Sequence, residues 1–167
     1  MKYLIVVDMQ NDFIDGALGT PEARAIVPYV ARKIKEFHGE VLFTRDTHFM
    51  NYMDSAEGKK LPVPHCIKDT DGWQIRSELQ ALSKKPPIDK LTFGSKELAA
   101  YFSDKDVESI TLLGLCTDIC VISNVLLLKA FYPEIPIAVD AGGCAGVTPE
   151  SHQNALNAMK MCQIDIL

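Results

Sequence analysis

Tyr3-Leu4-Ile5-Val6-Val7-Asp8 is an uninterrupted apolar run that ends on a carboxylate. A short continuous apolar run is typical of a β-strand buried on both faces of a parallel sheet. Helical spacing follows over Pro21–Phe37, where Thr20 is a candidate cap and Pro21 suits the first turn. Gly39 ends this helix, and Val41–Thr44 is interpreted as the second strand.

Strand-like and helix-like segments alternate along the rest of the chain. We expect further strands near Ile88 and at Ser109–Leu113, Ile137–Val139 and Ile164–Leu167, and further helices at Glu78–Leu82, Lys96–Phe102, Ile119–Tyr132 and Pro149–Met161. This alternation predicts a three-layer α/β/α fold with a Rossmann-like, mostly parallel sheet of about six strands. We expect one domain over residues 1–167, because the length suits one core and no linker or repeat is visible.

Composition argues against several classes of partner. The net charge of -5 offers no basic face for nucleic acid or for an anionic membrane, and no apolar run is long enough to span a bilayer. The five cysteines form no disulfide framework, and Met1-Lys2 leads directly into a strand instead of an export signal. We therefore expect a protein of the reducing cytoplasm.

Chemically active residues follow the predicted strands. In open parallel sheets the site lies at the carboxyl ends of the strands. The residues there are Asp8, Asp46, His48, Lys90, the segment Gly114–Cys120 and the segment Asp140–Cys144. Cys120 would be a nucleophile in the first turn of a helix capped by Thr117 or Asp118, where the helix dipole and Lys90 lower its pKa. Asp8 could then accept the thiol proton as general base.

Each of these residues also has an ordinary structural interpretation. A lone cysteine at a helix start is often packed and inert, Asp8 could cap a turn, and Lys90 could be a solvated surface lysine. Cys116 and Cys120 could also form a redox pair. His152 in the last predicted helix suits a surface or capping role. A catalytically silent binding or redox-sensing protein therefore stays open as an alternative, and only the joint placement of the residues favours an enzyme.

Five short motifs occur in a fixed order along the chain. They are Val7–Phe13 followed by Gly16, then Thr44–His48, Pro64–Ile67, Lys90–Ser95 and Gly114–Cys120. Together they resemble the isochorismatase-like cysteine hydrolases, whose best-known members are the nicotinamidases (pyrazinamidases). The resemblance spans Leu4 to Asp140 and so covers nearly the whole chain.

The resemblance implies a catalytic triad of Asp8, Lys90 and Cys120. The thiolate would attack an amide carbonyl, release ammonia or an amine, and leave a thioester that water hydrolyses. The family pattern also implies a non-proline cis peptide bond between Leu115 and Cys116. The backbone amides of Cys116 and Cys120 would then form the oxyanion hole.

A divalent metal site is implied at Asp46, His48 and His65, with Glu57 or, less well, Asp54 as a fourth ligand. A carboxylate and two imidazoles suit Zn, with Mn or Fe as alternatives, and no organic cofactor is expected. In a nicotinamidase the ion would hold the pyridine nitrogen. In the alternative interpretation the two histidines only form hydrogen bonds or bind substrate, because many relatives outside the nicotinamidases lack a metal.

The substrate pocket would include Phe13, as a stacking ring, and Leu115. Core packing is the alternative role for Phe13. One departure from the nicotinamidase pattern is Pro62, which stands where Trp or Phe usually occurs three residues before the second metal histidine. Trp73 could partly replace that aromatic wall or could pack the long loop Arg45–Trp73 onto the domain.

The resemblance favours a small amide as substrate, with hydrolysis of nicotinamide to nicotinate and ammonia as the leading hypothesis. An N-carbamoyl-amine or another small amide is the alternative within the same class. Isochorismate itself is disfavoured, because cleavage of its vinyl ether does not need Cys120. Family relatives are commonly oligomeric, so a homodimer or homotetramer is expected.

Overall fold

One six-stranded sheet organises the protein, in the order β3-β2-β1-β4-β5-β6. The computed structural model describes residues 1–167. The strands are β1 (Lys2–Val7), β2 (Glu40–Asp46), β3 (Ile88–Lys90), β4 (Ser109–Leu115), β5 (Ile137–Ala145) and β6 (Asp165–Ile166). Every neighbouring pair is parallel. The prediction of a mostly parallel Rossmann-like sheet is therefore confirmed, and this strand order places a topological switch point between β1 and β4.

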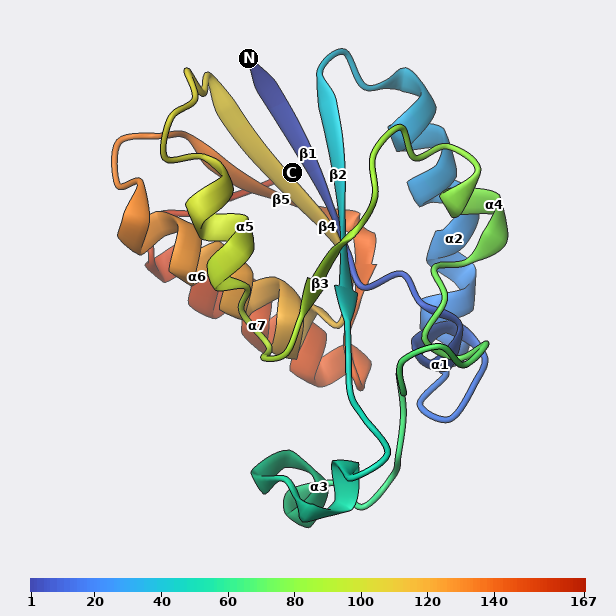
Figure 1. Cartoon of the computed structure of the whole chain (residues 1–167). Helices are drawn as coiled ribbons and strands as arrows, with labels where there is room; N and C mark the ends of the chain where they lie inside the picture. The colour runs from blue at the N-terminus through green and yellow to red at the C-terminus, as the bar shows by residue number, and fades with distance from the viewer.

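Helices cover both faces of the sheet, as Figure 1 shows. One face carries α2 (Pro21–Glu36), with α1 (Asn11–Ile14) and α4 (Ser77–Gln80) beside it. The other face carries α5 (Lys96–Tyr101), α6 (Ile122–Phe131) and α7 (Pro149–Met161). A short segment with a 3₁₀ turn at Tyr52–Asp54 and α3 (Ala56–Lys60) extends beyond the carboxyl end of β2. The expected α/β/α layering is confirmed.

The first strand and helix form for the reasons that their sequence indicates. Leu4–Val7 is at most 2% exposed, as a central strand covered on both faces requires. The Thr20 hydroxyl accepts a hydrogen bond from the Ala23 amide at 3.0 Å, which caps α2 as predicted. The core face of α2 consists of Ala23, Val27, Val30 and Ile34. None of the helices combines the length and apolar character that crossing a bilayer requires.

Strand β5 is longer than the predicted Ile137–Val139 and runs on to Ala145. Asp140 therefore lies within the strand instead of at its end. Its carboxylate accepts a hydrogen bond from the Tyr29 hydroxyl and pairs with Lys33, both at 2.9 Å and both on α2. Asp140 thus connects α2 to the sheet and is not part of the site described below.

The central strands approach each other closely at Gly114, whose φ is +122°. A Cβ atom at this position would collide with the carbonyl oxygen of Val7 on β1. Glycine avoids this contact and tolerates the positive φ. The close approach matters because the residues that follow β1 and β4 form the candidate site.

The predicted loop Arg45–Trp73 contains the end of β2, the 3₁₀ turn and α3, which the sequence analysis did not identify. Trp73 anchors this segment to the body of the protein. Its ring lies 3.3 Å from the Arg45 guanidinium carbon, and its indole N–H donates to the Thr47 hydroxyl at 2.9 Å. Trp73 therefore packs the loop onto the domain, which was one of the two roles that the sequence analysis predicted for it.

Candidate active site

Three charged side chains converge at the carboxyl edge of the sheet because their strands are neighbours. Asp8 follows β1 with φ of +47°, and Asp46 and Lys90 are the last residues of β2 and β3. The order β3-β2-β1 places them side by side. A positive φ is uncommon outside glycine and occurs preferentially at functional sites. Cys120 reaches the same edge from the connection between β4 and α6.

The Lys90 ammonium is the centre of the cluster. Its Nζ lies 2.7 Å from Asp8 Oδ2, 3.0 Å from Asp46 Oδ1 and 3.4 Å from Cys120 Sγ. Asp8 and Lys90 are fully buried, and Cys120 is 4% exposed. The Thr44 hydroxyl donates to the other oxygen of Asp8 at 2.7 Å. The structure thus brings the predicted carboxylate, lysine and cysteine together in one water-poor cluster and excludes a surface role for Lys90.

Burial dominates the protonation equilibria of this cluster. It raises the pKa of the Asp8 carboxyl above its ordinary value. Burial, and then the neighbouring Asp8 carboxylate, also raise the pKa of the Cys120 thiol well above its ordinary value. Burial opposes the charge of Lys90, but Asp8, Cys120 and Asp46 together outweigh burial, so the pKa of Lys90 is raised and the ammonium persists. The expected lowering of the thiol pKa is therefore wrong, and Cys120 needs a base to become a nucleophile.

The turn that carries Cys120 differs from the predicted helix start. Residues Thr117–Val121 form a π-helical turn before α6, and neither element has a side-chain cap. Thr117 and Asp118 therefore do not cap the helix. The Thr117 hydroxyl is instead hydrogen-bonded to Nδ1 of a half-buried His152 on α7 at 2.7 Å. The surface or capping role expected for His152 is thus also wrong, because this residue ties α7 to the turn.

The peptide bond between Leu115 and Cys116 is cis, as the family resemblance implied. The backbone N–H of Cys116 donates no hydrogen bond within the protein. A free amide beside the nucleophile is the kind of donor that an oxyanion needs. All five cysteines are unpaired, and Cys116 and Cys120 form no disulfide.

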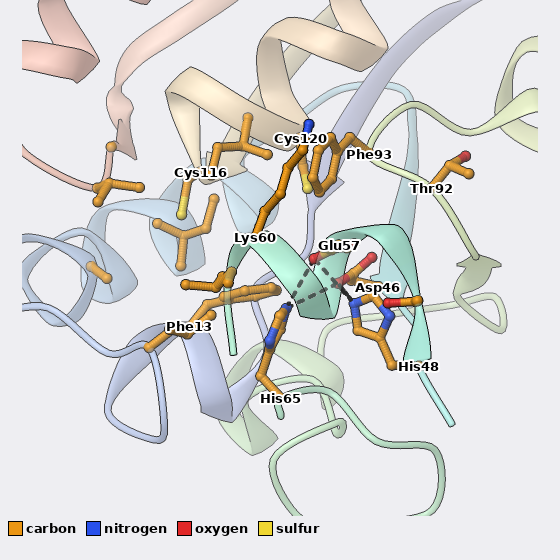
Figure 2. A pocket seen from close by; sticks show the side chains of 18 of the residues that line it. Phe13, Asp46, His48, Glu57, Lys60, His65, Thr92, Phe93, Cys116 and Cys120 are labelled. Carbon is orange, nitrogen blue, oxygen red and sulfur yellow. Dashed lines mark ion pairs between the residues drawn. The ribbon is translucent and has the colours of Figure 1, made fainter. Parts of the chain in front are cut away.

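A second group of polar side chains lies beside the cluster, shown in Figure 2. The ligand atoms of Asp46, His48 and His65 all lie within 4.8 Å of one another. Asp46 Oδ2 is 2.9 Å from His48 Nε2 and 3.8 Å from His65 Nε2. Glu57 Oε1 is 3.6 Å from both imidazole nitrogens, whereas Asp54 is exposed and outside the group. The geometry thus places Glu57, and not Asp54, beside the three expected ligands.

The donor atoms of this group fit a divalent metal. His48 Nε2 is buried, with Asp46 Oδ2 at 2.9 Å and Glu57 Oε1 at 3.6 Å but no hydrogen bond of good alignment, and an ion shared with these carboxylates would satisfy it. His65 Nδ1 lies 2.8 Å from the Val63 carbonyl oxygen. Because a carbonyl only accepts, Nδ1 carries the proton in the neutral ring and the lone pair of Nε2 points into the group. The structure therefore contains a possible Asp-His-His metal site.

A cavity of about 720 Å³ opens onto both groups. Phe13, Leu115, Cys116 and Cys120 line it, together with Asp46 and both histidines. The Phe13 ring lies 5.4 Å from the His65 ring, between centroids, at 58°. Neither Pro62 nor Trp73 lines the cavity, so Trp73 does not replace the aromatic residue that is missing at position 62.

Three polar side chains that the sequence analysis did not single out support the site. Gln10, Thr44 and Asn124 are fully buried. Asn124 donates to the Cys120 carbonyl oxygen at 2.8 Å and to that of Phe93 at 3.1 Å, which connects α6 to the loop after β3. Gln10 and Thr44 belong to the quoted motifs, and Asn124 is a lone amide in an apolar helix. Those two signals could have identified them.

Comparisons with known proteins agree with this geometry. The isochorismatase domain family matches residues 2–167. The nicotinamidase of Escherichia coli is 26% identical over 194 residues, which cover 96% of this chain and 90% of that protein. A crystal structure of the pyrazinamidase of Pyrococcus horikoshii in complex with zinc has a TM-score of 0.78, 28% identity and coverage of 99% and 98%. The pyrazinamidase/nicotinamidase of Streptococcus mutans has a TM-score of 0.83, 27% identity and complete coverage of both chains.

Proposed function

We propose, since the chain belongs to the isochorismatase domain family, that it is a cysteine-dependent amidohydrolase acting on the C–N bond of a small amide. Nicotinamide, converted to nicotinate and ammonia, is the substrate that we propose first. The observation that carries the proposal is the contact of one buried ammonium, Lys90, with both Asp8 and Cys120 at the wall of a cavity. The names of the similar nicotinamidases support the choice of substrate.

In the proposed reaction Asp8 accepts the thiol proton of Cys120 as sulfur attacks the amide carbonyl carbon. The raised pKa of Asp8 makes this carboxylate a stronger base than an exposed aspartate. Asp8 then returns the proton to the departing nitrogen, which leaves as ammonia, and the acyl group stays on sulfur as a thioester. A water molecule loses a proton to Asp8 and adds to the acyl carbon, which releases the acid and regenerates the thiol.

Lys90 and the backbone stabilise the charges that develop. The ammonium lies 3.4 Å from sulfur and favours the thiolate as it forms. The unpaired Cys116 amide, with that of Cys120, would donate to the carbonyl oxygen as it becomes an oxyanion. Removal of one such donor typically slows the reaction by about 10²–10³.

Asp46, His48 and His65 would hold a divalent ion, with Glu57 in reach as a further ligand. We propose Zn, with Mn or Fe as alternatives, because nitrogen and carboxylate donors suit all three. Such an ion would supply Lewis acidity toward a ring nitrogen of the substrate. Phe13 would stack on the ring from the cavity wall.

The test is ammonia release from nicotinamide by purified protein supplied in turn with Zn, Mn or Fe. We expect turnover that disappears in Cys120→Ala and in Asp8→Asn. Labelling of Cys120 by iodoacetamide that is slowed in Asp8→Asn would support the role of Asp8 as the base. No ammonia with any metal, together with no metal retained, would refute the nicotinamide assignment. Turnover that survives unchanged in Cys120→Ala would refute the cysteine-hydrolase class.

We also propose that the chain acts as one domain in the cytoplasm and assembles with itself. The single sheet supports one domain, and five unpaired cysteines suit a reducing compartment. A homodimer or homotetramer is the proposed assembly, because family relatives are commonly oligomeric. Light scattering of the purified protein measures the assembly directly.

A further inference from the structure

Lys60 is a cationic side chain in the cavity that the proposed mechanism does not use. It is the last residue of α3 and lies three positions after Glu57, so both side chains share one face of that helix. Glu57 faces the metal-site histidines. Figure 2 shows Lys60 extending from α3 into the pocket, toward the side on which Cys116 and Cys120 lie. Both Lys60 and Glu57 line the cavity.

The Lys60 ammonium has no partner in the protein. The ion pairs around the cavity join Asp46 and Glu57 to the two histidines, and join Lys90 to Asp8 and Asp46. None of them includes Lys60. Twelve of the 21 residues that line the cavity are hydrophobic, among them Leu61, Leu91 and Phe93. Lys60 is an exposed residue, so its ammonium is accessible to a ligand and its attraction to a ligand charge is partly screened by solvent.

The cavity is also larger than nicotinamide needs. Its volume of about 720 Å³ lies within the range of sites that hold drug-sized ligands. A single pyridine ring with one amide leaves much of that space unfilled. The acidic groups of the cavity, Asp46 and Glu57, both contact the metal-site histidines, whereas the Lys60 side chain extends toward Cys116 and Cys120. An anionic substituent is therefore favoured at the Lys60 ammonium.

We propose that the preferred substrate is a small amide with a carboxylate distant from the scissile C–N bond, and that Lys60 binds this carboxylate. The inference rests on the proposed amidase function and specifies the substrate class of the same site. A carboxylate matches one lysine, whereas a phosphate group carries more charge and is usually held by several donors. Lys60 is therefore a specificity-determining residue, and its contribution lies in substrate binding.

The experiment compares ammonia release from three probes: nicotinamide, 5-carbamoylnicotinate and the methyl ester of 5-carbamoylnicotinate. The acid and the ester differ in one charge and keep the same ring and amide. We expect kcat/KM for the acid to exceed that for the ester by about tenfold, mainly through KM, as one partly screened ion pair allows. The ratio should fall toward one in Lys60→Met and at high ionic strength.

Lys59→Met is the matched control, because Lys59 is exposed on the same helix and does not line the cavity. This variant should keep the wild-type ratio of acid to ester. Equal kcat/KM values for acid and ester in the wild type, or an unchanged ratio in Lys60→Met, would overturn the role of Lys60 and leave the proposed amidase intact. Failure of all three probes to release ammonia would overturn the proposed function, and this inference with it.

Discussion

Gln10→Met tests whether one buried amide side chain holds the metal-site strand in place. Gln10 is fully buried, and its Oε1 accepts from the Asp46 amide at 2.7 Å. Its Nε2 donates to the carbonyl oxygens of Asp46 at 2.8 Å and Trp73 at 2.9 Å. Methionine has a similar length and volume but makes none of these hydrogen bonds. The substitution thus deprives three buried backbone groups of their partner while leaving little cavity.

Each unsatisfied buried group costs about 1–3 kcal/mol, and partial relaxation of the surrounding structure favours the lower end of this range. We therefore expect Gln10→Met to lower the free energy of unfolding by about 3–4 kcal/mol. For a chain of this size that corresponds to a fall in Tm of about 6–16 °C. Thermal and urea unfolding with a chelator present measure the loss without a contribution from metal binding. Gln80→Met is the control, because Gln80 is exposed on α4. A Tm for Gln10→Met within about 2 °C of the control would refute the reasoning.

Three further predictions concern catalysis, metal binding and pH. Cys120→Ala should lower kcat by about 10⁴ or more in the ammonia assay while preserving cooperative unfolding, and residual turnover near the wild-type rate would exclude Cys120 as the nucleophile. His65→Ala should abolish the rise in Tm that added Zn causes in the wild type, and a retained rise would place the ion elsewhere. Burial lowers the pKa of His152, so the folded state resists its protonation and stability should fall as pH drops below about 6.5. His152→Gln should flatten this part of the urea-midpoint profile, and an unchanged slope would contradict the assignment.

The fold was predictable where local pattern and chain direction agree. The apolar run before Asp8 identifies a buried strand, and the rule for parallel sheets then places Asp8, Asp46 and Lys90 at one edge. The Thr20 cap and the apolar face of α2 were likewise visible in the sequence. For these residues the information is local, so no knowledge of distant contacts was needed.

The features of the fold and site that the sequence did not predict depend on contacts between distant segments. The extension of β5 through Gly142-Gly143 is stabilised by pairing with β4 across a register shift, which no local pattern reveals. Helix α3 is too short to form alone and relies on its Ser55 cap and on packing. The raised pKa of Cys120 also escaped prediction, because a position near a helix start indicates the dipole but not how deeply the sulfur is buried.

Asp46 faces in two directions, with one oxygen on Lys90 and the other toward His48. The metal site and the cluster around Lys90 therefore share Asp46, so a substitution of this residue changes both. A substitution that weakened the grip on an ion would also remove a neighbour of the lysine that serves the nucleophile. Substitutions in the segment around α3 that leave Glu57 in place would alter the cavity wall without touching this shared carboxylate. A substitution at the sheet edge, in contrast, affects both the metal site and the lysine beside the nucleophile.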